Sequence, residues 1–237
     1  MRLFYQKDID LKQKNFILNE VDSKHAIKVL RLKTNSIIHI MDGIGNLIEG
    51  KIVDNNPKKA IIEIITNTYF KNPNTPHLHI AIAPTKNQDR IEWFIEKAIE
   101  IGINEITPIF CDNSERKIIK SERLEKIIIS ASKQSLQYHL PILNTPKSFS
   151  NFLPSVNSTN KYIAHCYESE KSQLSKCKTD NSTTIMIGPE GDFSLNEVQN
   201  ATKNYKFKGI SLGNSRLRTE TAGIVACHTF KLINSIL

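Results

Sequence analysis

The spacing of hydrophobic residues along the chain changes near residue 72. Before that point, short apolar runs alternate with polar residues, and the clearest runs cover residues 36–41, 47–53 and 60–65. Asp42-Gly43 between the first two runs is a strong hairpin signal. After that point, apolar runs of strand length alternate with stretches in which apolar residues recur every three or four positions. The pattern predicts a β-rich N-terminal part and an α/β C-terminal part, whose mostly parallel sheet is covered on both faces.

The two parts are expected to be separate domains. Segment 71–76 is polar and contains Pro73 and Pro76, which suits a linker. The predicted domains are therefore residues 1–72 and 73–237. In the second domain, strands are expected at residues 78–83, 106–110, 162–166, 183–187 and 208–212. Helices are expected at residues 89–101 and 121–138, and loops at residues 149–160 and 169–182.

Two of the predicted helices carry expectations about single side chains. Asp89 and Glu92 have the spacing of a capping box, and Trp93 is expected to point into the core. A short helix is also expected at residues 25–32, where basic and apolar residues would fall on opposite faces. Its inward side chains would be Ala26, Val29 and Leu30, and its outward ones Lys24, Lys28 and Arg31. The outward bases could meet phosphates or simply be solvated.

Two apolar strands end in glycine-containing loops that lead into helices. The strand at 183–187 continues into Gly188-Pro189-Glu190-Gly191, and Ser194 with Glu197 then forms a capping box. The strand at 208–212 continues into a loop that ends in Arg218-Thr219-Glu220. Each loop by itself is more often only a connector. Open α/β sheets bind ligands at the carboxyl ends of their strands, so the two loops together predict a ligand site.

The amino-acid composition shows an excess of basic over acidic residues. The 237 residues contain 32 Lys and Arg against 24 Asp and Glu, for a net charge of +8. Residues 1–72 contain 12 basic and 8 acidic side chains, so they hold half of that excess in less than a third of the chain. The excess favours a polyanionic partner for the N-terminal part, and a merely solvated lysine-rich surface explains it equally well.

Several kinds of chemistry are excluded by missing motifs. The chain has no Walker A loop, no Gly-x-Ser-x-Gly elbow and no Gly-x-Gly-x-x-Gly fingerprint. Its four cysteines are scattered without Cys-x-x-Cys spacing, and His77 with His79 lacks a third ligand in view, so no metal site is predicted. No signal peptide and no long apolar run are visible. We therefore expect a cytoplasmic protein without a membrane segment.

The motifs resemble those of the 16S rRNA (uracil-N3)-methyltransferase family, RsmE, within the SPOUT superfamily of knotted methyltransferases. The resemblance covers most of the chain in the right order, and the two cofactor-loop motifs are its most specific part. These are Ile187-Gly188-Pro189-Glu190-Gly191 and Leu217-Arg218-Thr219-Glu220-Thr221-Ala222. Supporting stretches are His25 with 29–32, the helix motif from Lys86 to Gly102, and Gln134-Ser135 with Pro141. The chain departs from the family after Leu212-Gly213, where Asn214, Ser215 and Arg216 replace the usual Pro-Arg and aliphatic residue.

The resemblance implies a fold, a cofactor and partners. It implies an N-terminal PUA-like β-barrel that binds RNA, a C-terminal sheet ending in a trefoil knot, and a homodimer. The cofactor would be S-adenosylmethionine, and the substrate 16S rRNA of the small ribosomal subunit. The implied cofactor-binding residues are Gly188, Pro189, Glu190, Gly191, Leu212, Gly213, Leu217 and Arg218, with His165, Cys166 and Tyr167 on a third side.

The implied reaction assigns roles to polar residues. Uracil N3 carries a weakly acidic proton and faces its pairing partner, so the base must be unpaired or flipped out. Arg218 is the candidate that stabilises the developing uracil anion, and Glu220 or Glu190 would orient the base or take its proton. For Glu220, a helix N-terminal acid is nearly as good an interpretation. The candidate RNA contacts are Lys28, Arg31, Lys86, Arg90, Arg116 and Arg216. An intrahelical ion pair is an equal alternative for Arg90.

Three other functions compete with this interpretation. They are a SPOUT enzyme that methylates a ribose or a tRNA base, a non-catalytic RNA-binding protein, and an unrelated α/β enzyme for a small anionic substrate. The modified nucleoside, a methyl-transfer assay and cofactor binding distinguish these functions.

Overall fold

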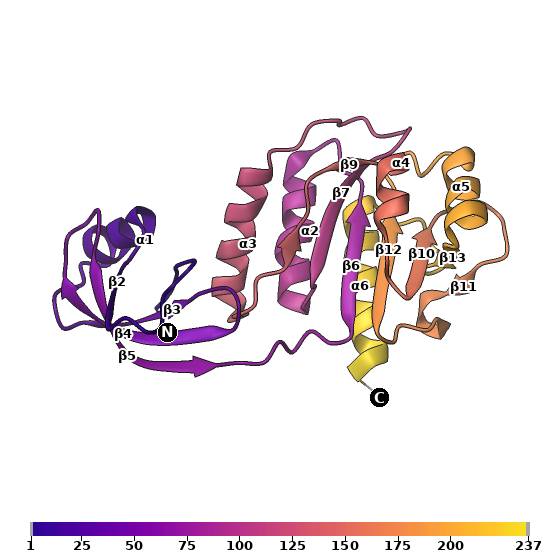
Figure 1. The fold of residues 1–237 in the computed structure, drawn as a ribbon. Coiled ribbons are helices and arrows are strands. Elements are labelled where there is room, and N and C mark those ends of the chain that lie inside the picture. Colours follow the sequence, from indigo (N-terminus) through magenta and orange to yellow (C-terminus); the bar gives the residue numbers. More distant parts are fainter. Residues whose placement is uncertain (1, 236–237) are drawn as a thin grey trace. The chain divides into compact units, whose positions relative to one another are not determined.

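The computed structural model describes residues 2–235, and these form two compact units (Figure 1). The first unit contains the chain up to residue 72 together with residues 132–140, and the second contains residues 73–131 and the chain from 141 onward. The boundary after residue 72 was expected from the linker composition. The inclusion of residues 132–140 in the first unit has no counterpart in the hydrophobic pattern.

The first unit is built on a mixed five-stranded sheet. Its strands are β1 (Leu3–Tyr5), β2 (Asn15–Ile17), β3 (Ile37–Met41), β4 (Asn46–Asp54) and β5 (Ile61–Tyr69). Their order is β1-β3-β4-β5-β2, and β1 pairs with β3 in parallel while the other pairs are antiparallel. The three predicted strands are confirmed. β5 is longer than expected because residues 66–69 continue the pairing with β4 as far as Asn46.

The helix predicted at residues 25–32 begins earlier and changes type. It starts as α1 (Glu20–Lys24), capped by the Asn19 side chain, and continues as the π-helical segment η1 (His25–Val29). The wider turn of a π-helix shifts side chains away from the 3.6-residue spacing. Ala26 is buried as expected, but Val29 is 65% exposed, so its predicted inward position is wrong.

The second unit contains an eight-stranded sheet whose pairs are all parallel. The strands are β6 (His77–Ile82), β7 (Glu105–Phe110), β8 (Ile142–Leu143), β9 (Lys147–Ser148), β10 (Asn160–Ala164), β11 (Ser172–Gln173), β12 (Ser182–Ile187) and β13 (Lys208–Ser211). Their order is β11-β13-β10-β12-β6-β7-β8, and β9 pairs with β7. The order brings β10, β12 and β13 side by side although they follow each other at intervals along the chain.

Helices cover both faces of this sheet, which confirms the predicted mostly parallel α/β architecture (Figure 1). The helices are α2 (Gln88–Ile101), α3 (Ser121–Ser135), α4 (Phe149–Phe152), α5 (Leu195–Tyr205) and α6 (Thr219–Ser235), with short turns η2 (Leu153–Ser155) and η3 (Leu174–Lys176). On one face α4 and α5 bury Phe149, Phe152 and Val198 against the strands. On the other, α2 and α6 pack together where Gly223 faces Phe94.

Several local expectations for the second unit are wrong. The cap of α2 is Asn87, whose side chain accepts from the backbone of Asp89, because Glu92 instead bonds Gln88 and Arg123. Trp93 is 45% exposed rather than in the core. α3 ends at Ser135 instead of residue 138, because the next residue, Leu136, takes a left-handed conformation.

The segment expected as a loop at residues 149–160 contains α4 and η2, and it contributes buried aromatic side chains to the core. The other expected loop, at residues 169–182, includes β11 and η3. Among residues 2–235, no helix combines the length and the apolar character needed to cross a membrane.

Candidate cofactor-binding site

A pocket of about 330 Å³ opens at the carboxyl ends of β10, β12 and β13. Three segments line it, each following one of these strands, and the first turn of α6 completes it. This is the edge of an open parallel sheet where ligands bind. The lining residues are Ala164, His165, Cys166, Lys171, Ile187, Gly188, Pro189, Glu190, Asp192, Ile210, Ser211, Leu212, Gly213, Asn214, Ser215, Arg216, Leu217, Thr219 and Ala222.

The first cofactor loop, residues 188–193, is fixed by the start of α5. Ser194 caps the helix by accepting from the backbone of Glu197, and the Glu197 carboxylate accepts from the backbone of Ser194. The predicted capping box is therefore confirmed. Glu197 is buried, and burial raises the pKa of its carboxyl group. The loop thus ends on a rigid helix terminus.

The second cofactor loop, residues 212–218, is joined to the first by the buried side chain of Thr219, the residue that follows it. The Thr219 hydroxyl donates to the Gly188 carbonyl at 3.0 Å, and Thr219 is 4% exposed. Gly213 has a φ of 140°, a conformation that side-chain-bearing residues rarely adopt, and its added Cβ would meet open space. The loop therefore needs glycine for its backbone and not for room.

The third wall of the pocket, residues 164–167, is held by groups from two directions. The Asp192 carboxylate accepts from the Cys166 backbone at 2.7 Å, and the Tyr167 hydroxyl donates to the Phe193 carbonyl at 2.8 Å. Lys171 donates to the carbonyls of His165 and Tyr167 at 3.0 and 2.6 Å. Burial, together with the Lys171 charge, lowers the pKa of His165 below its ordinary value.

Most of the predicted cofactor-binding residues line one pocket. His165, Cys166, Gly188, Pro189, Glu190, Leu212, Gly213 and Leu217 are in the lining. Tyr167, Gly191 and Arg218 are adjacent to lining residues along the chain but are not in the lining themselves. Tyr167 instead bonds the first loop, and Gly191 is contacted by Asn113. The direct cofactor contacts expected of these three residues stay predictions.

The three candidate catalytic residues occupy different environments. Glu190 lines the pocket, and one of its carboxylate oxygens accepts from the Lys86 backbone at 3.0 Å. Arg218 is exposed at the start of α6. Glu220 is 7% exposed, and one of its oxygens lies 3.8 Å from the Nε atom of Arg90 on α2. Glu190 is thus the carboxylate next to the pocket, and Glu220 is packed between two helices.

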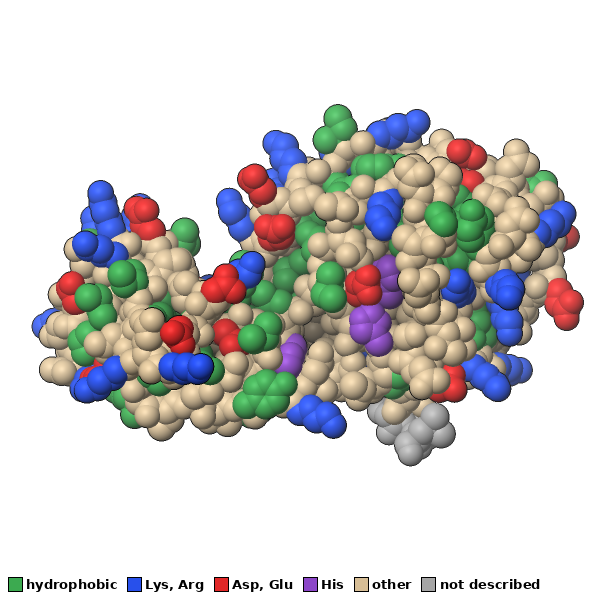
Figure 2. Space-filling model, viewed as in Figure 1, with side chains coloured by type: hydrophobic (Ala, Val, Ile, Leu, Met, Phe, Trp, Pro, Cys, Tyr) green, Lys and Arg blue, Asp and Glu red, His purple; other side chains and the backbone are tan. Residues whose placement is uncertain are grey.

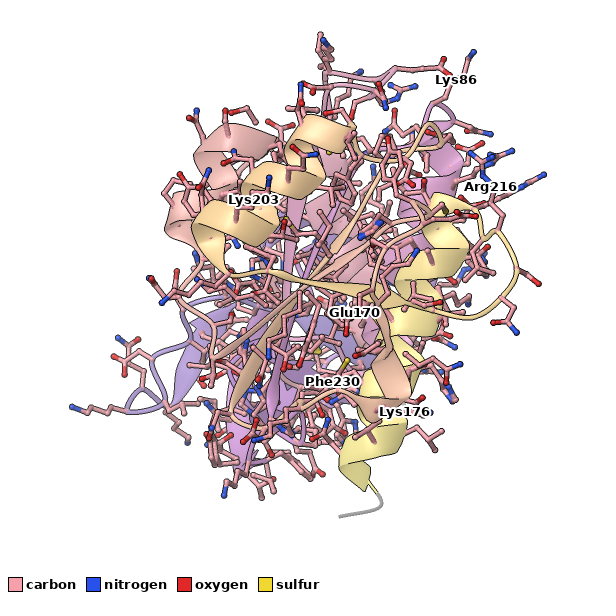
Figure 3. The ribbon with its side chains drawn as sticks, turned by 90° about the vertical axis from the view of Figure 1, so that its right-hand side faces the viewer. Lys86, Glu170, Lys176, Lys203, Arg216 and Phe230 are labelled. Carbon is pink, nitrogen blue, oxygen red and sulfur yellow. The ribbon has the colours of Figure 1, made fainter. Side chains whose placement is uncertain are left out.

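The predicted RNA contacts are divided between the two units. Lys28 and Arg31 are exposed in the first unit. In the second, Lys86 forms an ion pair with Glu115 at 2.9 Å, and Arg116 donates to the carbonyls of Thr85 and Lys86. Arg216 lines the pocket, and Figure 3 shows Lys86 and Arg216 projecting outward at the same end of this unit, while Phe230 lies inside it. Arg116 is thus already engaged in holding a loop.

Sequence reasoning missed three residues that build the site. Asp192 and Lys171 fasten the third wall, and Thr219 joins the two cofactor loops. Thr219 stands inside the second motif and Asp192 directly after the first, so their positions were a usable signal. Lys171 belongs to a segment without any pattern and could not have been found.

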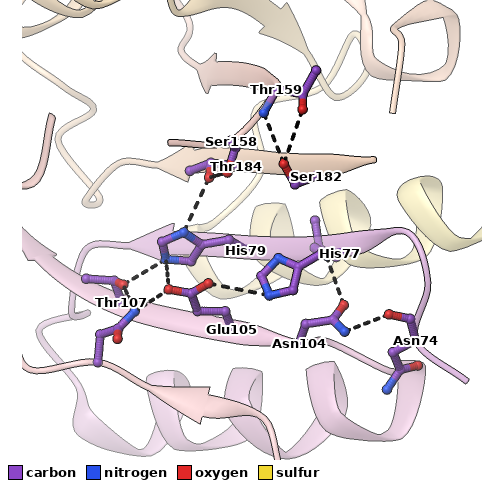
Figure 4. Close-up of polar contacts among 12 residues, drawn as sticks. Asn74, His77, His79, Asn104, Glu105, Thr107, Ser158, Thr159, Ser182 and Thr184 are labelled. Carbon is purple, nitrogen blue, oxygen red and sulfur yellow. Dashed lines mark hydrogen bonds and ion pairs between the residues drawn. The ribbon is translucent and has the colours of Figure 1, made fainter. Parts of the chain in front are cut away.

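A second hollow lies on the sheet face that α4 and α5 cover, and it contains His77, His79 and Glu105. His79 is 7% exposed and contacts the hydroxyls of Thr107 and Thr184 at 2.7 and 3.3 Å (Figure 4). Figure 2 shows histidine and acidic side chains together on this unit. Burial lowers the pKa of His79 to about 4. Within residues 2–235, no three His, Cys, Asp or Glu side chains are arranged to hold a metal ion.

Comparison with known families defines the class of the chain. Residues 72–231 match the family of RNA methyltransferase domains, and residues 18–65 match the RNA methyltransferase PUA domain. The matched ranges correspond to the α/β unit with the pocket and to the mixed sheet of the first unit. The fold and the site therefore define an RNA methyltransferase with a PUA domain.

The chain belongs to the ribosomal RNA small subunit methyltransferase E family. It is 35% identical to the member from Buchnera aphidicola subsp. Acyrthosiphon pisum, over 95% of this chain and 90% of that relative. A crystal structure described as a probable rRNA-methyltransferase from Porphyromonas gingivalis is 34% identical, with a TM-score of 0.89 over 100% of this chain and 99% of that one. The family member from Neisseria gonorrhoeae, solved bound to S-adenosyl methionine, is 26% identical, with a TM-score of 0.83 over 96% and 95%.

Proposed function

We propose that this protein transfers a methyl group from S-adenosylmethionine to N3 of a uridine in the 16S rRNA of the small ribosomal subunit. The observation that carries the proposal is the pocket shared by the two cofactor loops, which Thr219 joins to Gly188. Family membership supports the reaction class, since the relatives are named as small-subunit rRNA methyltransferases. The choice of N3 as the methylated atom rests on the family resemblance of the two loop motifs.

The pocket fits such a cofactor. Its volume of about 330 Å³ lies within the range of small-molecule sites. The backbone amides and carbonyls of Gly188, Leu212 and Gly213 would hold the polar edges of the cofactor, and Ile187, Ile210 and Leu217 would contact its apolar parts. When bound, the cofactor supplies an electrophilic methyl group on a sulfonium.

Three charged residues around the pocket would have separate roles in the reaction. Arg218 is exposed beside the pocket, where its guanidinium would stabilise negative charge on a uracil carbonyl as N3 loses its proton. Glu190 would accept that proton, because it lines the pocket and only one of its oxygens is engaged by the Lys86 backbone. Glu220 would orient the start of α6 through its contact with Arg90.

Basic side chains would bind the rRNA backbone. Arg216 and Lys86 stand at the pocket end of the second unit, and Lys28 with Arg31 is exposed on the first. These residues suit phosphate contacts, which position an RNA without reading its sequence. We further propose that the protein acts as a homodimer in the cytoplasm and that the segment after β12 forms a trefoil knot.

A methyl-transfer assay tests the proposal. The purified protein is incubated with labelled S-adenosylmethionine and small ribosomal subunits from a strain that lacks the endogenous enzyme. The modified nucleoside is then identified by mass spectrometry. The expected product is N3-methyluridine. A ribose-methylated product or a methylated tRNA base would indicate another enzyme of the superfamily, and cofactor binding without transfer would indicate an RNA-binding protein.

A further inference from the structure

The segment after β7, residues 111–117, contacts the first cofactor loop from outside the pocket lining. The Asn113 side chain donates to the Gly191 carbonyl at 3.1 Å and to the Asp192 carbonyl at 3.0 Å. Both carbonyls belong to the turn that leads from β12 into α5. One amide group therefore fixes two consecutive peptide units of the loop. A Cβ added to Gly191 would lie 3.2 Å from the Cβ of Asn113, so the two segments are also in close contact.

The peptide units that Asn113 holds include a residue in an unusual conformation. Asp192 has a φ of 63°, a left-handed conformation that is unfavourable for most L-residues. In this conformation one carboxylate oxygen accepts from the Phe193 backbone at 2.8 Å, and the other accepts from the Cys166 backbone at 2.7 Å. Asp192 thus connects the first cofactor loop to the third wall of the pocket.

Asn113 itself stands on a rigid support. The neighbouring Ser114 is buried, and its hydroxyl accepts from the Cys111 backbone at 2.9 Å. Asp112 is bonded twice to the start of α5, since its backbone donates to Glu197 at 3.0 Å and its carboxylate accepts from the Ser194 hydroxyl at 2.6 Å. The capping box of α5 therefore also anchors the segment that carries Asn113.

We propose that Asn113 is a positioning residue for the cofactor pocket, acting through Asp192 on the backbone of Cys166. The inference rests on the proposed function, because it takes S-adenosylmethionine as the ligand of the pocket. A pocket wall that is already held in place loses little conformational freedom when ligand binds, and this increases affinity. Asn113 does not line the pocket, so its loss affects cofactor binding more than the transfer step.

Replacement of Asn113 by aspartate is the sharpest test because it preserves shape. The carboxylate cannot donate, and it faces the carbonyl oxygens of Gly191 and Asp192. Calorimetry with S-adenosylmethionine is expected to show about tenfold weaker binding for Asn113→Asp, in line with two lost hydrogen bonds. The KM for the cofactor rises by a similar factor, and kcat stays within about threefold of the wild-type value.

The matched control is Asn204→Asp. Asn204 is an exposed asparagine of α5 whose amide donates to Asn200 on the same helix. This variant is expected to bind the cofactor like the wild-type protein. If Asn113→Asp does not fold, Asn113→Ala takes its place, with an expected loss of about threefold to fivefold because it removes the donors without adding repulsion.

The outcomes separate this inference from the proposed function. If the wild-type protein binds S-adenosylmethionine and the Asn113 variants bind it with the same affinity, the positioning role is contradicted. A fall in kcat at constant KM in these variants also contradicts it. Neither result affects the proposed function. A wild-type protein that does not bind S-adenosylmethionine contradicts the proposed function, and with it the ligand on which the positioning role depends.

Discussion

The Thr219 hydroxyl donates a hydrogen bond to the Gly188 carbonyl at 3.0 Å, across 31 positions of the chain. The bond joins the end of β12 to the start of α6, and both partners line the same pocket. The sequence predicts that the two glycine-containing loops form one site, and this bond links them directly. The bond therefore links two of the three segments that line the pocket.

Replacing Thr219 by valine is expected to weaken cofactor binding. The substitution keeps the shape of the buried Thr219 side chain but leaves the partly buried Gly188 carbonyl without its donor. The loss of such a bond costs about 1–3 kcal/mol, so calorimetry is expected to show roughly tenfold weaker binding of S-adenosylmethionine. Thr219→Ser retains the hydroxyl and is expected to bind normally. Equal affinities for all three proteins would contradict the role given to this bond.

Arg218→Ala is expected to abolish most of the methyl transfer while leaving the fold unchanged. Arg218 is exposed, so its truncation removes little packing. Loss of one group that stabilises developing negative charge lowers kcat about 10²–10³-fold. Single-turnover methyl transfer measures the rate, and thermal unfolding measures the fold. Near-normal turnover in this variant would overturn the assignment.

The two glutamates are expected to behave differently when converted to glutamine. Glu190→Gln removes the carboxylate that lines the pocket, so kcat falls by about 10²-fold or more and cofactor affinity changes little. Glu220→Gln keeps the packing of a buried side chain beside Arg90, so kcat changes by less than about tenfold. Parallel measurement of kcat and cofactor affinity distinguishes them. The reverse order of effects would move the proton acceptor to Glu220.

Gly223→Ala is expected to destabilise the second unit, although alanine favours helices. A Cβ at this position would lie 2.5 Å from the Cε2 atom of Phe94, where α6 packs against α2. Overpacking of this kind costs about 1–3 kcal/mol, against a gain of about 1 kcal/mol in helix propensity. Urea unfolding measures the difference. Combining it with Phe94→Leu should relieve part of the loss, and a more stable single variant would contradict the packing argument.

The stability of the protein is expected to fall between pH 6.5 and pH 4 partly because of His79. Burial lowers its pKa to about 4 from the ordinary value of 6.5, so the unfolded chain binds the extra proton first. The stabilisation is complete above pH 6.5 and is lost as the pH falls, by about 2 kcal/mol at pH 5. Urea unfolding at pH 7.5 and 5 checks this.

The matched variant for this pH effect is His79→Asn, which removes the titrating group. Its loss of stability between the two pH values should be smaller than that of the wild-type protein by about the same 2 kcal/mol. His77, Glu105 and Lys147 act on His79 through their charges and are unchanged in both proteins. Identical losses in both proteins would show that His79 does not titrate in this range.

The sequence predicts most strands and both cofactor loops because their signals are local. The apolar run at residues 183–187 and the Ser194–Glu197 capping box specify a strand and a helix start without help from distant residues. The glycine loops follow directly from these elements. The pocket could therefore be placed at one edge of a parallel sheet from the order of elements alone.

The errors arise where tertiary contacts override a local pattern. Asp89 and Glu92 have capping-box spacing, but Glu92 is engaged by Gln88 and Arg123, and the latter lies far along the chain. Val29 was placed inward by assuming 3.6 residues per turn, whereas the segment is π-helical. Asn113 reaches the site only through folding, since 78 positions separate it from Gly191, and no motif marks it.

The presence of residues 132–140 in the first unit limits how that unit could be exchanged between proteins. Tyr138 accepts from the backbone of Gly45, Leu140 donates to Gly43, and the His139 ring bonds the Phe70 carbonyl. A single splice after residue 72 would leave these backbone groups without their partners. A transplant of the first unit onto another enzyme must therefore carry two separate pieces of the gene, and recombination at one point could not move the unit whole.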